Sequence, residues 1–141
     1  MKNILVFLLL ITSQILLAQT VEIKITNIKN KNGSFQLAVY KDAASYENKT
    51  PLLKNKYLKT NVNTNGELMV ILNLAEGTYG IALLDDENGN TKMDYNFLGM
   101  PKEGFGFSDF YLTGISKPTF TDFDFLLKNE TKNITIKIRY L

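Results

Sequence analysis

The chain contains neither cysteine nor histidine. Without these residues it cannot form disulfides, zinc sites of the usual kinds, Ser-His-Asp triads or Cys-His nucleophilic pairs. Two of the side chains on which enzyme active sites often depend are therefore missing. Carboxylates are left for acid–base chemistry, and a hydrophobic core has to hold the fold.

A strong net charge is also missing. The 16 Lys and Arg residues stand against 14 Asp and Glu residues, which gives a formal net charge of +2. A nearly neutral chain gives no electrostatic reason to expect binding to nucleic acid or to an anionic membrane surface. The length of 141 residues and the hydrophobic content of 45% suit one globular domain.

A hydrophobic run occupies the N-terminus, over residues 1–18. Lys2 precedes an apolar segment from Ile4 to Leu17, and Ala18 is a suitable residue before a cleavage site. This is the pattern of a secretory signal peptide, and the apolar segment is short for a membrane span. The sequence predicts export to the periplasm, the cell surface or the medium. It also predicts a single mature domain over residues 19–141, with no membrane span after cleavage.

Short segments of alternating apolar and polar residues predict strands along the rest of the chain. These segments cover residues 20–28, 35–40, 57–62, 68–74, 79–85, 120–127 and 134–140. Asn32-Gly33 predicts a tight hairpin after the first strand, and Asp42 is placed to cap one helical turn. Tyr79 is either a corner residue whose hydroxyl reaches the backbone or a half-buried side chain. The pattern predicts an all-β, antiparallel Ig-like or transthyretin-like β-sandwich of about seven strands with little helix.

A dense run of oxygen-bearing side chains follows the strand at 79–85. Asp86, Asn88, Asn90 and Asp94 occupy positions one, three, five and nine of a loop, and Lys92 at position seven would offer its backbone carbonyl. Alternating oxygen ligands at this spacing are typical of calcium loops. These residues form the predicted metal site, with calcium in a structural role. The alternative is a metal-free loop whose Asp and Asn side chains cap their own backbone.

Two residues depart from the calcium-loop pattern. Thr91 stands at position six, where glycine is expected, and Phe97 at position twelve cannot bind a metal ion. Asn96 or Asp85 would then have to complete the set of ligands.

Residues 94–108 combine glycines with aromatic side chains and predict a long loop. Phe97, Glu103, Phe105 and Phe107 are the candidates in it for contact with a ligand or partner. The aromatic rings either form a flat platform, as for sugars, or act as plugs that fix the loop to the edge of the sandwich. The second interpretation is favoured.

Three motifs resemble one known family. They are G-T-Y-G-I-A-L-L-D-D-E-N-G-N at 77–90, M-D-Y-N-F-L-G-M-P-K-E-G-F-G-F-S at 93–108 and P-T-F-T-D-F-D-F at 118–125. Together they resemble the bacterial domain-of-unknown-function family 2141 (DUF2141), apart from Thr91, where the family favours glycine. The resemblance implies a small exported β-sandwich of the transthyretin-like or carboxypeptidase-regulatory-like type in the bacterial envelope. It implies no assigned activity.

These features favour a non-enzymatic binding or interaction module of the cell envelope, whose partner is an unidentified protein or glycan. No catalytic residue and no cofactor other than structural calcium is predicted. One alternative is a hydrolase that acts on glycans with carboxylates alone, for which Asp94, Glu103 and Asp109 are the nearest candidates. The other is a purely structural module that assembles through its edge strands.

Overall fold

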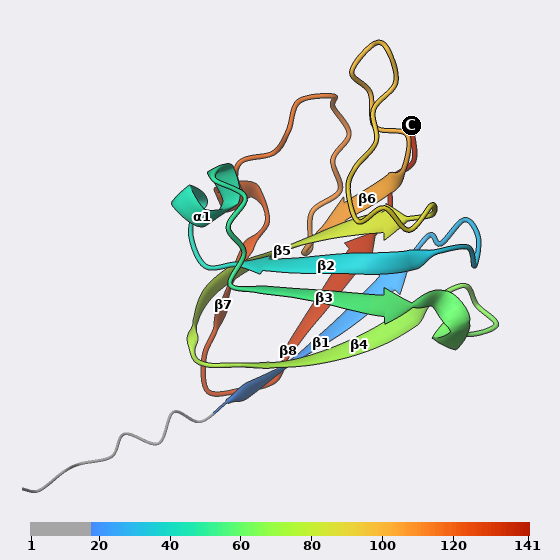
Figure 1. The fold of residues 1–141 in the computed structure, drawn as a ribbon. Helices are drawn as coiled ribbons and strands as arrows, with labels where there is room; N and C mark the ends of the chain where they lie inside the picture. Colours follow the sequence, from blue (N-terminus) through green and yellow to red (C-terminus); the bar gives the residue numbers. More distant parts are fainter. Residues whose placement is uncertain (1–17) are drawn as a thin grey trace, which may run out of the picture.

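The computed structural model describes residues 18–141, so the predicted signal peptide over residues 1–18 lies outside the described residues except for Ala18. The described part contains eight strands and one short α-helix (Figure 1). The strands are β1 (Gln19–Thr26), β2 (Ser34–Tyr40), β3 (Leu53–Leu58), β4 (Leu68–Leu74), β5 (Gly77–Asp86), β6 (Gly104–Phe107), β7 (Asp124–Leu127) and β8 (Lys132–Lys137). The helical segments are α1 (Ala43–Glu47) and two 3-10 turns, η1 (Lys59–Asn61) and η2 (Phe120–Asp122). Within residues 18–141, no helix has the length and apolar character needed to cross a membrane.

The strands form two sheets that pack face to face. The smaller sheet has the order β4-β1-β8, and the larger has the order β3-β2-β5-β6, with β7 also paired to β5. In Figure 1 the smaller sheet lies across one face of the larger sheet, and long loops rise from the other side. The predicted all-β sandwich is therefore confirmed, with eight strands. Its likeness to transthyretin stays a prediction.

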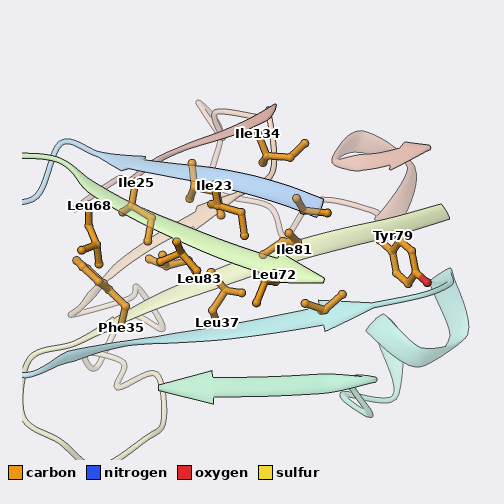
Figure 2. Close-up of a cluster of buried hydrophobic side chains, with 14 of the residues drawn as sticks. Ile23, Ile25, Phe35, Leu37, Leu68, Leu72, Tyr79, Ile81, Leu83 and Ile134 are labelled. Carbon is orange, nitrogen blue, oxygen red and sulfur yellow. The ribbon is translucent and has the colours of Figure 1, made fainter. Parts of the chain in front are cut away.

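Alternation along the strands sends one face of each sheet into a shared core. In β4, Leu68, Val70 and Leu72 are buried, while Met69 and Ile71 between them are exposed. Apolar side chains from β1, β2, β5 and β8 fill the rest of the space between the sheets (Figure 2). Because the chain has no cysteine, no disulfide supplements this buried apolar area, which stabilises the fold by roughly 25 cal/mol per Å².

The first and last strands lie side by side in the smaller sheet. β1 pairs with β8 in parallel and with β4 antiparallel. The pairings within the larger sheet are all antiparallel. The antiparallel prediction thus holds except for the pair that joins the two ends of the domain.

The predicted hairpin at Asn32-Gly33 is wrong. β1 and β2 belong to different sheets, so this turn carries the chain from one sheet to the other. Gly33 has a φ of +71°, and a Cβ on it would collide with the backbone carbonyl of Asp86. Glycine is needed here both for the close approach to Asp86 and for the left-handed backbone. A hairpin turn requires glycine for a similar backbone conformation, so the sequence does not distinguish the two cases.

The predicted loop over residues 94–108 ends in a strand, β6, that the sequence analysis missed. Its glycines allow it to approach the end of the chain closely, since a Cβ on Gly106 would lie 2.6 Å from Cγ2 of Ile136. Phe105 and Phe107 alternate with the glycines and contribute to a second apolar cluster, separate from the main core. Glycine here serves strand packing and does not mark a loop.

Three local predictions have different outcomes. The edge strand expected at 57–62 is β3, which lies earlier and gives way to a 3-10 turn. Asp42 caps α1 with its side chain, as predicted. Tyr79 is a corner residue, because its hydroxyl donates a hydrogen bond to the carbonyl of Ala75 at 3.0 Å.

Candidate functional site

The predicted metal loop begins with Asp86, at the end of β5. This side chain is fully buried, and its Oδ2 accepts hydrogen bonds from the Thr91 backbone N–H at 3.0 Å and from Gln36 Nε2 at 3.1 Å. Within residues 18–141, its Oδ1 has no hydrogen-bond partner. Leaving a buried carboxylate oxygen without a donor is costly. Oδ1 is therefore the atom of this loop that would gain most from a cation.

The two asparagines of the loop turn their amide nitrogens toward Asp94. Nδ2 of Asn88 and Nδ2 of Asn90 lie 2.6 and 2.9 Å from Asp94 Oδ2. Their oxygens accept hydrogen bonds from backbone N–H groups, Asn88 from Asn90 at 3.0 Å and Asn90 from Lys92 at 2.9 Å. The loop is thus closed by Asx turns, as in the metal-free alternative. Across residues 18–141, no group of three or more acidic, histidine or cysteine side chains is placed to hold a metal ion.

Thr91 follows the backbone path that a calcium loop gives to glycine. Its φ is +66°, in the left-handed region. A β-branched residue is strained there, so the surrounding contacts have to hold it in place. One of those contacts is the hydrogen bond from its N–H to Asp86. The turn that the calcium pattern requires is therefore formed despite the substitution.

Neither residue suggested to complete the set of ligands is available to do so. Asp85 and Asp86 point to opposite faces of β5. The Asp85 carboxylate pairs with Lys59 and Tyr140. The side-chain oxygen of Asn96 accepts the backbone N–H groups of its own turn.

Glu103 holds the loop together and does not line the groove described below. It is 5% exposed. Its Oε1 accepts the backbone N–H of Glu87 at 3.2 Å, and its Oε2 accepts that of Asp94 at 3.3 Å. One buried carboxylate therefore binds the backbone near both ends of the loop.

The three phenylalanines predicted to contact a ligand are not brought together. Phe97 is 95% exposed in the long loop before β6, which projects from the sandwich (Figure 1). Phe105 and Phe107 are buried, and the Phe107 ring lies 5.0 Å from that of Phe123, centroid to centroid. The plug interpretation fits Phe105 and Phe107 and does not fit Phe97.

A groove enclosing about 700 Å³ lies over the outer face of the larger sheet. Its volume is in the range of small-molecule sites, about 300–1,000 Å³. β2, β5 and β6 contribute to its lining, together with residues of the two loops on either side of β6. Five aromatic residues line it: Tyr40, Tyr46, Tyr95, Phe105 and Phe107.

Four lysines line the groove, and no Asp or Glu does. They are Lys49, Lys54, Lys92 and Lys117. Lys117 also lies 4.0 Å above the ring of Tyr46 and 3.5 Å from a carboxylate oxygen of Glu47, which is outside the lining. Such an exposed ion pair contributes little. The groove therefore has a positive lining in a chain that is close to neutral.

The loop after β6 is fixed to the sandwich by Arg139. Its Nη1 donates hydrogen bonds to the carbonyls of Leu112 and Gly114, at 2.6 and 2.5 Å. Both of these residues line the groove. A charged donor shared by two carbonyls makes strong hydrogen bonds, so this wall of the groove has a defined position.

Burial changes the acid–base properties of the groove tyrosines. It raises the pKa of Tyr40 above its ordinary value, and it raises that of Tyr46 further, with a smaller contribution from Tyr40. Both hydroxyls therefore stay protonated at physiological pH and are available as neutral donors to a ligand.

Neither Lys59 nor the role of the groove lysines was predicted from the sequence. For Lys59 there was a signal, because alternation places Asp85 on the core face of β5, where a carboxylate needs a buried partner. For the groove lysines there was none, because they come from separate segments that only the fold brings together.

The comparisons with known proteins agree with the sequence motifs. The model of the family described as "Uncharacterized protein conserved in bacteria (DUF2141)" matches residues 23–135. No curated protein and no solved structure matches the chain. The matched region begins within β1 and ends within β8, so it contains strands of both sheets and all of the groove lining except Leu141. The chain belongs to the DUF2141 family of bacterial proteins.

Proposed function

We propose that this protein is an exported, non-enzymatic binding module of the bacterial envelope that holds an acidic glycan in the groove of its larger sheet. The observation that carries the proposal is the lining of that groove, which combines five aromatic residues and four lysines with no acidic residue. The predicted signal peptide supports export. The absence of histidine and cysteine supports a role without catalysis.

The shape of the groove supports an oligosaccharide as ligand. A volume of about 700 Å³ accommodates a few sugar rings. Tyr95 is largely exposed at the groove and offers its ring for stacking, while Phe105 and Phe107 are nearly covered. Sugar rings present apolar C–H faces, which pack on aromatic rings, and hydroxyls, which hydrogen bond to neutral donors such as Tyr40.

The charges support an acidic ligand over a neutral one. Lysine ammonium groups pair with carboxylates, sulfates or phosphates as point charges. Lys49 and Lys92 are exposed and form no ion pair within the described chain. A ligand bearing negative charge would pair with both, and a neutral sugar would leave both solvated.

Calcium is proposed as a structural cofactor of the same site. Asp86 supplies an unpartnered, buried oxygen within the described residues, and Asp94 supplies a second carboxylate at the other end of the loop. Lys92 belongs to the metal loop and also lines the groove. A calcium ion held by the loop would therefore order one wall of the groove and take no part in a reaction.

The test is calorimetric titration of the exported protein with trigalacturonate and with maltotriose, an acidic and a neutral trisaccharide. The acidic sugar is expected to bind with an affinity that falls as salt rises, and the neutral one to bind weakly or not at all. Lys49→Gln and Lys92→Gln should each weaken binding of trigalacturonate by roughly two- to five-fold, the contribution of an exposed ion pair.

Lys31→Gln is the matched control. Lys31 is an exposed lysine in the turn between β1 and β2 and lies outside the groove lining. The Lys31→Gln substitution removes the same charge and should leave binding of trigalacturonate unchanged. Equal affinity for both sugars, or equal weakening by Lys31→Gln and Lys92→Gln, would count against the groove as an acidic-glycan site.

The glycan hydrolase and the structural assembly module remain predictions without a specific observation in their favour. Two of the three acids suggested for hydrolysis already accept backbone hydrogen bonds, Glu103 with both oxygens from the loop and Asp109 from the N–H of Thr135 in β8.

A further inference from the structure

One ion pair lies entirely inside the sandwich. Lys59, in η1, and Asp85, in β5, are each 0% exposed along their side chains. Nζ of Lys59 contacts Oδ1 of Asp85. Among the described residues, Oδ1 has no partner other than this amine. The amine is therefore held against this one carboxyl oxygen, away from water.

The groups in direct contact with the pair are apolar or neutral, and the carboxylate of Glu87 acts on Asp85 from beyond them. The ring centroid of Phe35 lies 5.0 Å from Lys59 Nζ. The Tyr140 hydroxyl donates a hydrogen bond to Asp85 Oδ2 at 2.6 Å and accepts one from the backbone N–H of Lys29 at 3.1 Å. Oδ1 of Asn30 lies 3.5 Å from Nζ and is the other polar neighbour of the amine.

Both side chains are removed from water, which is costly for charged groups. Burial raises the pKa of the Asp85 carboxyl, against the opposing contacts from Lys59 and Tyr140. Transfer of one proton from the ammonium to the carboxylate gives a neutral amine and a carboxylic acid, which are much less costly to keep out of water. These neutral forms are also the two reactants from which an amide forms.

We propose that Lys59 and Asp85 are joined by an intramolecular isopeptide bond between Nζ and the side-chain carboxyl carbon. The neutral amine attacks that carbon, and a C–N bond forms. The proton released by the amine and the acid proton of the carboxyl group both end on Oδ2, the oxygen held by Tyr140, the C–O bond to that oxygen breaks, and one water molecule leaves. Atoms and charge balance without an oxidant, a reductant or an activating group. Tyr140 is a positioning residue, since its hydroxyl holds Oδ2, the oxygen that departs, while Lys59 contacts Oδ1.

The bond would close a covalent ring over residues 59–85. This ring contains β4 of the smaller sheet and most of β5 of the larger one, so it links the end of β3 to the centre of the sandwich. The chain has no cysteine and cannot use a disulfide. An amide cross-link would stabilise an exported domain as a disulfide does, because it restricts the conformations of the unfolded chain.

The test is mass spectrometry of the exported, denatured protein, which does not depend on the folding of a variant. The wild-type chain is expected to weigh one water molecule less than its sequence. Trypsin cleaves after Lys56 and Lys92 but not after an amide-linked Lys59, so residues 57–92 should appear as one closed peptide with the same deficit. Lys59→Ala and Asp85→Ala should restore the full mass, and Lys54→Ala, a control on β3, should keep the deficit.

A variant that retains the core separates chemistry from folding. Tyr140→Phe keeps the ring and removes the hydroxyl that holds Oδ2, so a smaller fraction of linked chain is expected at a given time after synthesis. A wild-type protein of full sequence mass, or a deficit that maps outside residues 57–92, overturns the proposal and leaves an ordinary buried ion pair. Linkage in Tyr140→Phe as complete as in the wild type overturns the role of Tyr140.

Discussion

Asp85 and Asp86 are adjacent in the chain, and their carboxylates serve opposite faces of the larger sheet. Asp85 contacts the buried Lys59, whereas Asp86 accepts hydrogen bonds from Gln36 and from the backbone N–H of Thr91 in the predicted metal loop. The cause is the two-residue alternation of a strand, which continues to the last residue of β5. Two equivalent acids therefore have separate roles, one in the interior and one in the loop.

Calcium is expected to raise the melting temperature of the protein over residues 19–141 through Asp86. Extracellular calcium sites bind with a Kd of about 0.1–1 mM, so about 10 mM calcium approaches saturation. Linkage then stabilises the folded state by roughly 1.4 to 2.7 kcal/mol, or roughly 5 to 15 °C for a domain of this size. The measurement is thermal unfolding in chelator, in calcium and in magnesium.

Asp86→Ala should lose the calcium shift, because it removes the unpartnered carboxylate oxygen. Asp124→Asn is the control, since Asp124 is an exposed acid on β7 away from the loop. The same shift with magnesium, or a shift that persists in Asp86→Ala, would identify a general ion effect. No shift at all would leave the Asx turns around Asn88 and Asn90 as the whole explanation of the loop.

Gly106→Ala is expected to lower the free energy of unfolding by about 1–3 kcal/mol, the usual range for overpacking. A Cβ there would lie 2.6 Å from Cγ2 of Ile136 and 3.2 Å from the backbone oxygen of Lys137, and the latter has little freedom to move. Gly114→Ala is the control, because a Cβ on Gly114 meets nothing within 4 Å. Urea unfolding measures both, and equal midpoints would contradict the close packing of β6 on β8.

The strands with one clear apolar face were predictable, and their partners were not. The alternation of Val21, Ile23 and Ile25 is enough to place β1 in a half-buried sheet. Asn32-Gly33 fixes only a local turn, and which strands pair across it depends on the whole core. For the same reason Gly106 suggested a loop, since its role depends on Ile136, 30 positions later in the sequence.

The candidate site was predictable only where its residues are close in sequence. The spacing from Asp86 to Asp94 identified a loop that the structure closes with side-chain hydrogen bonds. Glu103 was assigned to a ligand, because nothing in the sequence shows that its carboxylate turns back to the loop backbone. The groove and the Lys59–Asp85 pair depend on contacts between distant segments, which strand patterns do not contain.

Tyr79→Phe is expected to lower the free energy of unfolding by about 1 kcal/mol, the net contribution of one hydrogen bond. The change removes the hydroxyl that donates to the Ala75 carbonyl and keeps the ring, which packs in the main core. Tyr111→Phe, at an exposed ring near Lys137, is the control and should have no effect. A Tyr79→Phe protein as stable as the wild type in urea would show that water satisfies this corner equally well.

The stability of the protein is expected to fall as pH rises above about 10, and Tyr46 should account for part of the loss. Burial raises the pKa of Tyr46 above its ordinary value of 10.0. Above pH 10 the unfolded chain loses this proton and the folded chain keeps it, so the contribution is complete below pH 10 and is lost as pH rises toward the folded pKa. The slope for one group is at most about 1.4 kcal/mol per pH unit.

Urea unfolding from pH 8 to 11 should show a shallower fall in the free energy of unfolding for Tyr46→Phe than for the wild type, with Tyr111→Phe as control. Parallel curves for Tyr46→Phe and the wild type would mean that the hydroxyl is solvated and that the groove is open at Tyr46.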